Sequence, residues 1–83
     1  MKKELGEPIK TIENCKIYKD FGSFGDGMWQ KHLTIASWFD NEPKFDIRPW
    51  NDDLSKCGKG IQLDDAEIFD LLGMLEDAIN FLG

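Results

Sequence analysis

The chain has 83 residues, enough for one domain with a thin core, because a chain of this length buries only about 60–65% of its unfolded surface. It has two cysteines, no signal-peptide pattern and no run of roughly 18 apolar residues, so we expect a cytoplasmic protein that does not span a membrane. The net charge of −6 argues against nucleic-acid binding, but all of the excess lies in residues 64–83, which contain no basic side chain.

The first part of the chain predicts a tail and one strand. Residues 1–10 are charged, contain glycine and proline, and are typical of a flexible N-terminal tail. A single domain is expected over residues 11–83. Thr11–Asp20 has spaced apolar residues and predicts a first strand. Phe21–Gly27 holds three glycines and predicts a hairpin loop.

Three further strands are expected in the middle of the chain. Met28–Asp40 is rich in β-branched and aromatic residues and predicts a long strand. A turn follows, and Lys44–Trp50 then alternates between polar and apolar residues. Pro49 cannot donate to a strand ladder, so this strand should lie at a sheet edge or end there. Gly58–Leu63 predicts a short last strand.

The C-terminal segment predicts a helix. Asp64 is a favourable N-cap, and Glu67 three residues later completes a capping-box pattern. Apolar residues then recur at helical spacing as far as Leu82, and Gly83 can end the helix. The fold class is therefore α+β: a four-stranded antiparallel sheet followed by one C-terminal helix (ββββα). The helix has more apolar side chains than one face of the sheet can bury. We therefore expect a second copy of the chain to bury the rest, in a homodimer joined through Ile68, Leu72, Leu75 and Ile79.

Catalytic chemistry finds little support in the sequence. His32 is the only histidine, and with Cys15 and Cys57 it gives at most three metal ligands, without close CxxC spacing. A thiol protease dyad has no local sequence signal either. We therefore expect neither an enzyme nor a metal or other cofactor.

One group of residues is typical of single-stranded nucleic-acid binding. Such proteins combine basic side chains that follow the phosphates with aromatic rings that stack on bases. The candidates are Trp38, Lys44, Arg48, Trp50, Lys56 and Lys59. The alternative is structural: both tryptophans pack into a dimer contact, and Arg48 pairs with Asp46 or Asp40.

The same residues resemble a known family. The segments Trp29-x-Lys31, Ser37-Trp38, Glu42-Pro43-Lys44-Phe45-Asp46-Ile47-Arg48-Pro49-Trp50 and Gly58-Lys59-Gly60-Ile61-Gln62-Leu63 precede an acidic-capped helix. They are similar to the transcriptional coactivator family of human positive cofactor four, and within it to the short bacterial YdbC-type proteins. The resemblance covers about Met28–Leu75. The eukaryotic members have a tryptophan in the first helical turn, where this chain has Ile68.

The resemblance implies a homodimer that binds single-stranded DNA along its sheets with little sequence preference, with RNA as an alternative ligand. It implies a role in transcription, replication or repair, together with proteins of those processes. A second hypothesis from the residues is a protein–protein adaptor on the same fold, with the acidic helix and exposed tryptophans as the docking surface. The distribution of basic side chains distinguishes the two: clustered cations favour nucleic acid, and cations paired with Asp40, Asp46, Asp52 and Asp53 favour the adaptor.

Overall fold

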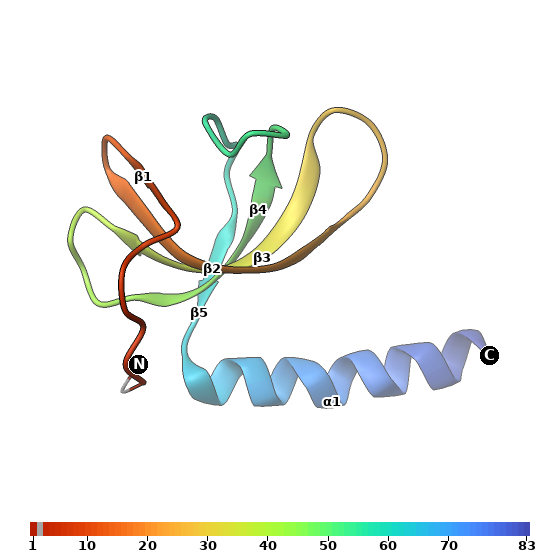
Figure 1. Ribbon diagram of the computed structural model, residues 1–83. Helices are drawn as coiled ribbons and strands as arrows, with labels where there is room; N and C mark the ends of the chain where they lie inside the picture. Colours follow the sequence, from red (N-terminus) through yellow and green to blue (C-terminus); the bar gives the residue numbers. More distant parts are fainter. Residues whose placement is uncertain (2) are drawn as a thin grey trace.

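A computed structural model describes residue 1 and residues 3–83. The described chain forms one antiparallel sheet whose strands lie side by side in chain order, followed by a helix (Figure 1). The elements are β1 (Lys10–Ile12), β2 (Cys15–Phe24), β3 (Gln30–Trp38), β4 (Lys44–Trp50), β5 (Ile61–Leu63) and α1 (Asp65–Leu82). The α+β class with one C-terminal helix is confirmed. The predicted number of strands is wrong, because the sheet has five.

The extra strand comes from the N-terminal region. Instead of one strand over residues 11–20, β1 and β2 form a hairpin in which Ile12 pairs with Cys15. The intervening Glu13 and Asn14 make the turn, a position that asparagine favours because its side chain can bond to nearby backbone. β2 also continues to Phe24, so the glycine-rich loop is shorter than expected.

Two irregularities bend β2 where it pairs with β3. The register shifts between Ile17 and Lys19, and again between Asp20 and Gly22. Gly22 has φ 139°, which residues with a Cβ rarely adopt. Extra residues of this kind increase local twist and curvature, and the sheet is visibly curled (Figure 1).

The other expected strands are found with small changes. β4 has the predicted bounds, but it lies between β3 and β5, so the edge position suggested by Pro49 is wrong. The strand instead ends one residue after the proline, the other outcome that the sequence allowed. β3 ends at Trp38 because Phe39 and Asp40 have φ 54° and 60°, outside the extended region.

The core lies on one face of the sheet, here called the core face. Its buried apolar members are Cys15, Ile17, Ala36 and Trp50. The segment after β4 folds over them, since Cys57 forms a bridge with Trp50 and Leu54 packs against the cluster. The other face, here called the helix face, carries Phe21, Ile35 and Phe45 near the start of α1.

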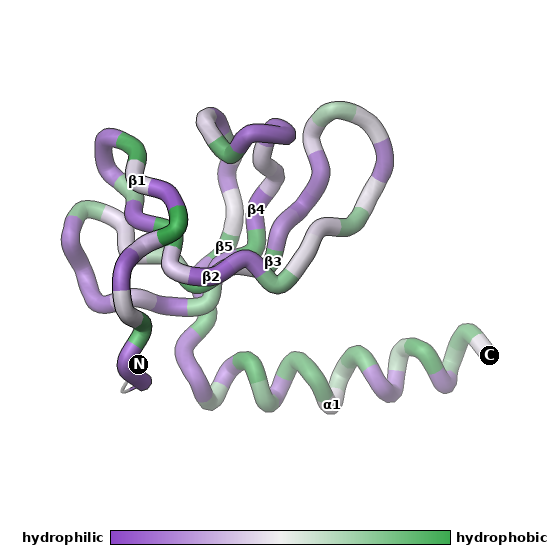
Figure 2. Tube along the Cα trace, in the orientation of Figure 1, coloured by the Kyte–Doolittle hydropathy of each residue, from purple (hydrophilic) through white to green (hydrophobic). Residues whose placement is uncertain are grey.

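α1 begins as predicted but is almost uncovered. The Asp64 side chain accepts from the Glu67 backbone N–H (2.8 Å), and Glu67 accepts from the Asp64 N–H (2.9 Å), which confirms the capping box. None of the helix residues, all of which the structure describes, is buried. Apolar residues continue along the whole helix (Figure 2). Within the described part of the chain, no helix is long and apolar enough to cross a membrane.

Candidate nucleic-acid interface

The centre of the candidate site is a buried carboxylate on β4. Asp46 is fully buried, and it accepts hydrogen bonds from Arg48 Nε (2.5 Å) and Nη2 (2.6 Å). It also accepts from Trp38 Nε1 on the neighbouring strand (3.1 Å). One carboxylate therefore fixes both a basic and an aromatic side chain.

The groups held by Asp46 also contact each other. The Arg48 guanidinium carbon lies 4.4 Å from the centroid of the Trp38 ring, in the arrangement of a cation–π contact. Trp38 in turn stacks on Trp50, with ring centroids 6.3 Å apart and planes at 23°. Trp38, Arg48 and Trp50 therefore lie on the same face of the sheet.

Electrostatics keep Arg48 charged in this partly buried position. Burial by itself lowers the pKa of Arg48, but the hydrogen bonds and negative charge of Asp46 outweigh it and raise the pKa above its ordinary value. Asp46 thus neutralises the cation that was expected to contact phosphate. The ion pair that the sequence offered as an alternative, Arg48 with Asp46, is present.

Trp50 does not have the exposure that base stacking needs. Its side chain is 1% exposed and belongs to the core cluster. The sequence offered Trp50 as a base-stacking ring, with packing into a dimer contact as the alternative. Trp50 therefore packs as a core residue, whereas Trp38 is only half-buried.

The lysines of the predicted site are exposed. Lys44 begins β4, and Lys56 and Lys59 lie in the segment that leads to β5. Gly58 donates its N–H to the Pro49 carbonyl (2.9 Å). At Gly60 a Cβ would lie 2.2 Å from the Arg48 Cβ, so only glycine fits there. The two glycines thus allow the segment that carries Lys59 to pack closely against β4.

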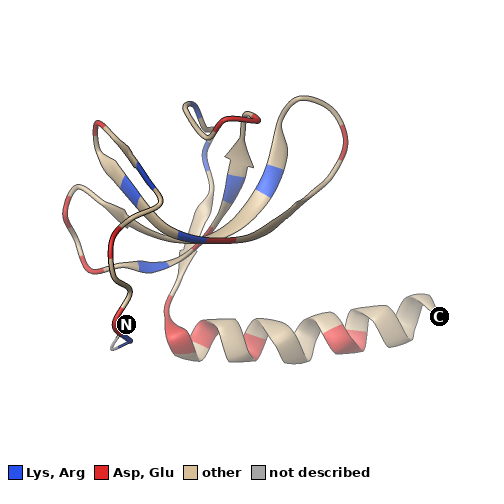
Figure 3. Cartoon of the chain, viewed as in Figure 1, with Lys and Arg blue, Asp and Glu red and all other residues tan. Residues whose placement is uncertain are grey.

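Basic and acidic residues are unevenly distributed over the fold. Among the described residues, lysine and arginine lie on the strands, their connections and the N-terminal segment, whereas the charged residues of α1 are all acidic (Figure 3). The acidic helix is attached at the β5 edge, and its contacts to the sheet are with β4 and β5.

The sequence missed one aromatic residue near Trp38. Phe39 was expected to lie within the long strand Met28–Asp40, but its φ of 54° turns the chain. Its ring is 68% exposed and its centroid lies 6.5 Å from that of Trp38. A bulky residue with positive φ is a strained conformation, of a kind often found at functional sites. The turn-forming pair Asp40-Asn41 was the only sequence signal for it.

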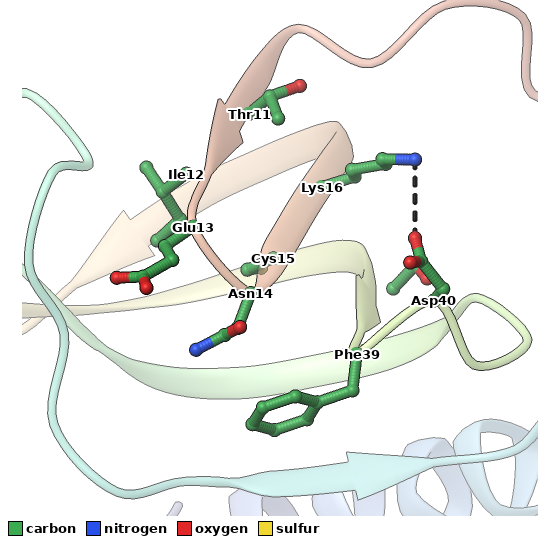
Figure 4. Close-up of a pocket in the computed structure, with 9 residues that line it drawn as sticks. Thr11, Ile12, Glu13, Asn14, Cys15, Lys16, Phe39 and Asp40 are labelled. Atoms are coloured by element: carbon green, nitrogen blue, oxygen red, sulfur yellow. Dashed lines mark ion pairs between the residues drawn. The ribbon is translucent and has the colours of Figure 1, made fainter.

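Phe39 borders a hollow of about 360 Å³ between the β1–β2 turn and the β3–β4 hairpin (Figure 4). Lys16 from β2 reaches across it to Asp40, with Nζ 3.3 Å from the carboxylate oxygen. This end of the sheet therefore carries the exposed ring of Phe39, but the nearby Lys16 is already paired with Asp40.

Of the residues weighed for catalysis, Cys15 and Cys57 meet at the core cluster, whereas His32 hydrogen-bonds to an aspartate. His32 Nδ1 lies 3.0 Å from an Asp20 carboxylate oxygen. Burial raises the pKa of Cys15 to about 12, helped by the negative charge of Asp46, so this thiol is protonated at neutral pH. Among the described residues there is no cluster of three or more histidine, cysteine or carboxylate side chains that could hold a metal.

The predicted dimer residues lie along α1. Ile68 is half-buried and borders an apolar hollow with Phe21 and Phe45 on the helix face. The exposed fractions of Leu72, Leu75 and Ile79 are 54%, 50% and 66%. Three successive turns of the helix thus present bare apolar side chains.

The fold and the site define a small α+β protein with a five-stranded antiparallel meander and an uncovered acidic helix. No family model matches the chain. It is 33% identical over 78 residues to an uncharacterized protein of Treponema pallidum (strain Nichols), and the match covers 90% of this chain and 91% of the relative. The chain belongs to the same family as that protein.

Proposed function

We propose that the protein is a homodimeric binding module for single-stranded nucleic acid, DNA first and RNA as the alternative, without catalytic activity. The observation that carries the proposal is the rigid Trp38–Arg48 pair on Asp46, next to the exposed ring of Phe39. Exposed lysines at positions 44, 56 and 59 add charge for phosphates. The resemblance to the positive cofactor four family supports the same function, with a role in transcription, replication or repair.

Because Trp50 is buried, we move the proposed stacking role to other rings of the predicted site. Base stacking is worth about 1–3 kcal/mol per base, but only for a ring that a base can reach. We assign that role to Trp38 and Phe39, with Trp50 supporting Trp38 from beneath. Arg48 acts mainly by holding the Trp38 ring, and the lysines supply the net positive charge.

The homodimer is proposed from the uncovered helix. α1 exposes Leu72, Leu75 and Ile79, and the helix face of the sheet leaves Phe21 49% exposed. A contiguous apolar surface of this kind marks an interaction site in a protein of this size. A second copy is the occupant that we propose, because a small domain gains most from symmetric burial of the same surface.

The test is fluorescence anisotropy of a labelled oligothymidine of about 20 nucleotides at two salt concentrations, with duplex DNA as competitor. Single-strand binding that weakens with salt and survives duplex competitor is the expected result. Absence of binding at low salt and tens of micromolar protein would refute it.

One observation favours the adaptor hypothesis as a second candidate. Arg48 is paired with Asp46, and Lys16 is paired with Asp40, so two cations near the aromatic residues are already neutralised. An adaptor would retain the dimer and the exposed aromatic rings but show no salt-dependent binding to oligonucleotides.

A further inference from the structure

Two ion pairs lie beside the aromatic rings of the proposed interface, and they differ in how firmly they are held. In the Arg48–Asp46 pair, two guanidinium nitrogens donate to an almost fully buried carboxylate. In the Lys16–Asp40 pair, the side chains are 45% and 85% exposed, and Nζ lies 3.3 Å from the carboxylate oxygen. Water and salt screen an exposed pair of this kind, so it contributes little to stability. Lys16 can therefore leave its partner at small cost, whereas Arg48 cannot.

Lys16 and the exposed ring of Phe39 belong to the same hollow. Lys16 comes from β2 and Phe39 follows the end of β3, and both line the space of about 360 Å³ (Figure 4). The backbone N–H of Phe39 donates to the Asn14 carbonyl (2.8 Å), which ties the end of β3 to the β1–β2 turn. Lys16 is paired with Ser37 in the register of β2 and β3. Main-chain contacts thus hold the cation and the ring at one place.

The charges of this hollow do not attract a free phosphate. Among the described residues its lining contains one lysine, Lys16, and two carboxylates, Glu13 and Asp40. The lysine is already paired with Asp40, whereas Glu13 forms no ion pair within the described part of the chain. A phosphate needs a further contact that keeps it near Lys16 before it can compete with the carboxylate.

A base stacked on Phe39 supplies that contact. Each base of a single strand is linked through one sugar to the backbone, so stacking brings the adjacent phosphate to the hollow at a high effective concentration. The carboxylate that it displaces is mostly in water already and is not left buried without a partner. Phe39 and Asp40 follow each other, with φ 54° and 60°, so one turn of the backbone positions both the ring and the competing anion.

We infer that Lys16 exchanges Asp40 for a backbone phosphate when a base stacks on Phe39, and that Asp40 limits the affinity of the interface by competing for Lys16. This inference rests on the proposed function. It adds Lys16 as a phosphate-binding residue to the exposed lysines at positions 44, 56 and 59, and it assigns the ion pair a role in binding.

The experiment is a double-mutant cycle measured by anisotropy with labelled oligothymidine. Asp40→Asn removes the competing charge and tolerates the positive φ, and Lys16→Gln removes the cation. Asp40→Asn should tighten binding about two- to fivefold more in the parent than in the Lys16→Gln background, the range expected for an exposed ion pair. Glu13→Gln is the control: it removes the same charge from the same hollow and should have equal effects in both backgrounds.

The salt dependence of binding gives a second measurement. Lys16→Gln should lower the slope of log affinity against log salt by about 0.7, because one phosphate contact is lost. Equal effects of Asp40→Asn in the two backgrounds, or an unchanged slope in Lys16→Gln, would overturn the exchange and leave the proposed function standing. Failure of the parent chain to bind oligothymidine would instead overturn both.

Discussion

Asp46 and Arg48 lie two residues apart on β4, and two nitrogens of the guanidinium donate to the two oxygens of that carboxylate. The side chains are 1% and 14% exposed, so water screens the pair weakly. The backbone alternation of a strand places both side chains on the core face, where Trp38 adds a third hydrogen bond. Asp46 therefore holds both Arg48 and Trp38 in place on the core face.

Breaking the pair should destabilise the fold. Asp46→Asn leaves the Arg48 charge without its counterion, and removing one partner of a buried ion pair typically costs about 3–5 kcal/mol in the free energy of unfolding. Urea denaturation followed by circular dichroism measures the loss. The double variant with Arg48→Met should be more stable than the sum of the single losses predicts, and strict additivity would contradict the coupling.

Exposed lysines should set the salt dependence of oligonucleotide binding. Each contact with a phosphate of a single strand contributes roughly 0.7 to the slope of log affinity against log salt. Lys59→Gln or Lys44→Gln should each lower the slope by about that amount without changing stability. Lys31 is also exposed but points to the helix face, so Lys31→Gln is the control and should retain the parent slope.

Two substitutions of Phe39 should distinguish its proposed stacking on bases from the energetic cost of its backbone conformation. Phe39→Ala should weaken oligothymidine binding by about 1–3 kcal/mol, the usual contribution of one stacked base. Phe39→Asn should weaken binding equally but raise the free energy of unfolding, because asparagine tolerates the positive φ of 54°. Anisotropy and urea denaturation give the two quantities. Unchanged affinity in both variants would leave Trp38 as the sole stacking ring of the proposed surface.

A charge on the apolar stripe of α1 should dissociate the dimer. Leu75→Glu places a carboxylate where we expect the second copy to pack, and sedimentation velocity should show a monomer. Asn80→Glu adds the same charge away from the stripe and should leave the dimer intact. A dimer that persists in Leu75→Glu would show that another surface joins the two copies.

Stability should fall at high pH because of Cys15. The pKa of this thiol is about 12 in the fold, against an ordinary value of 9.0. Above pH 9 the unfolded chain releases the proton while the folded chain keeps it, so the free energy of unfolding declines by at most about 1.4 kcal/mol per pH unit up to pH 12. In Cys15→Ala the free energy of unfolding should fall less steeply with pH than in the parent. Urea denaturation at several pH values between about 8 and 11 measures the difference.

Sequence patterns that span only a few neighbouring residues predicted the helix start and one strand correctly. The Asp64–Glu67 capping box and the alternation of Lys44–Trp50 were found with the expected bounds. The split of the first strand at Glu13-Asn14 was missed, because a two-residue turn hardly interrupts the spacing of apolar residues.

The errors at the site arise from tertiary contacts. Alternation assigned Trp50 to the face of Arg48, but it could not show that the segment with Leu54 and Cys57 folds back over the ring. The position of Phe39 depends on its own positive φ, which the turn-forming pair Asp40-Asn41 does not specify. Replacing Trp50 with alanine would consequently test the core, and a binding loss in that variant would be confounded by unfolding.

Because α1 is acidic, dimer formation and oligonucleotide binding should respond to ionic strength in opposite directions. Pairing two copies through α1 brings together like charges, which salt screens within about 8–10 Å at physiological concentrations. Added salt therefore strengthens the dimer while it weakens the hold of the lysines on phosphates. Competition between these effects would give oligonucleotide affinity a maximum at intermediate salt when the protein is dilute, and a monotonic decline when it is concentrated enough to remain paired.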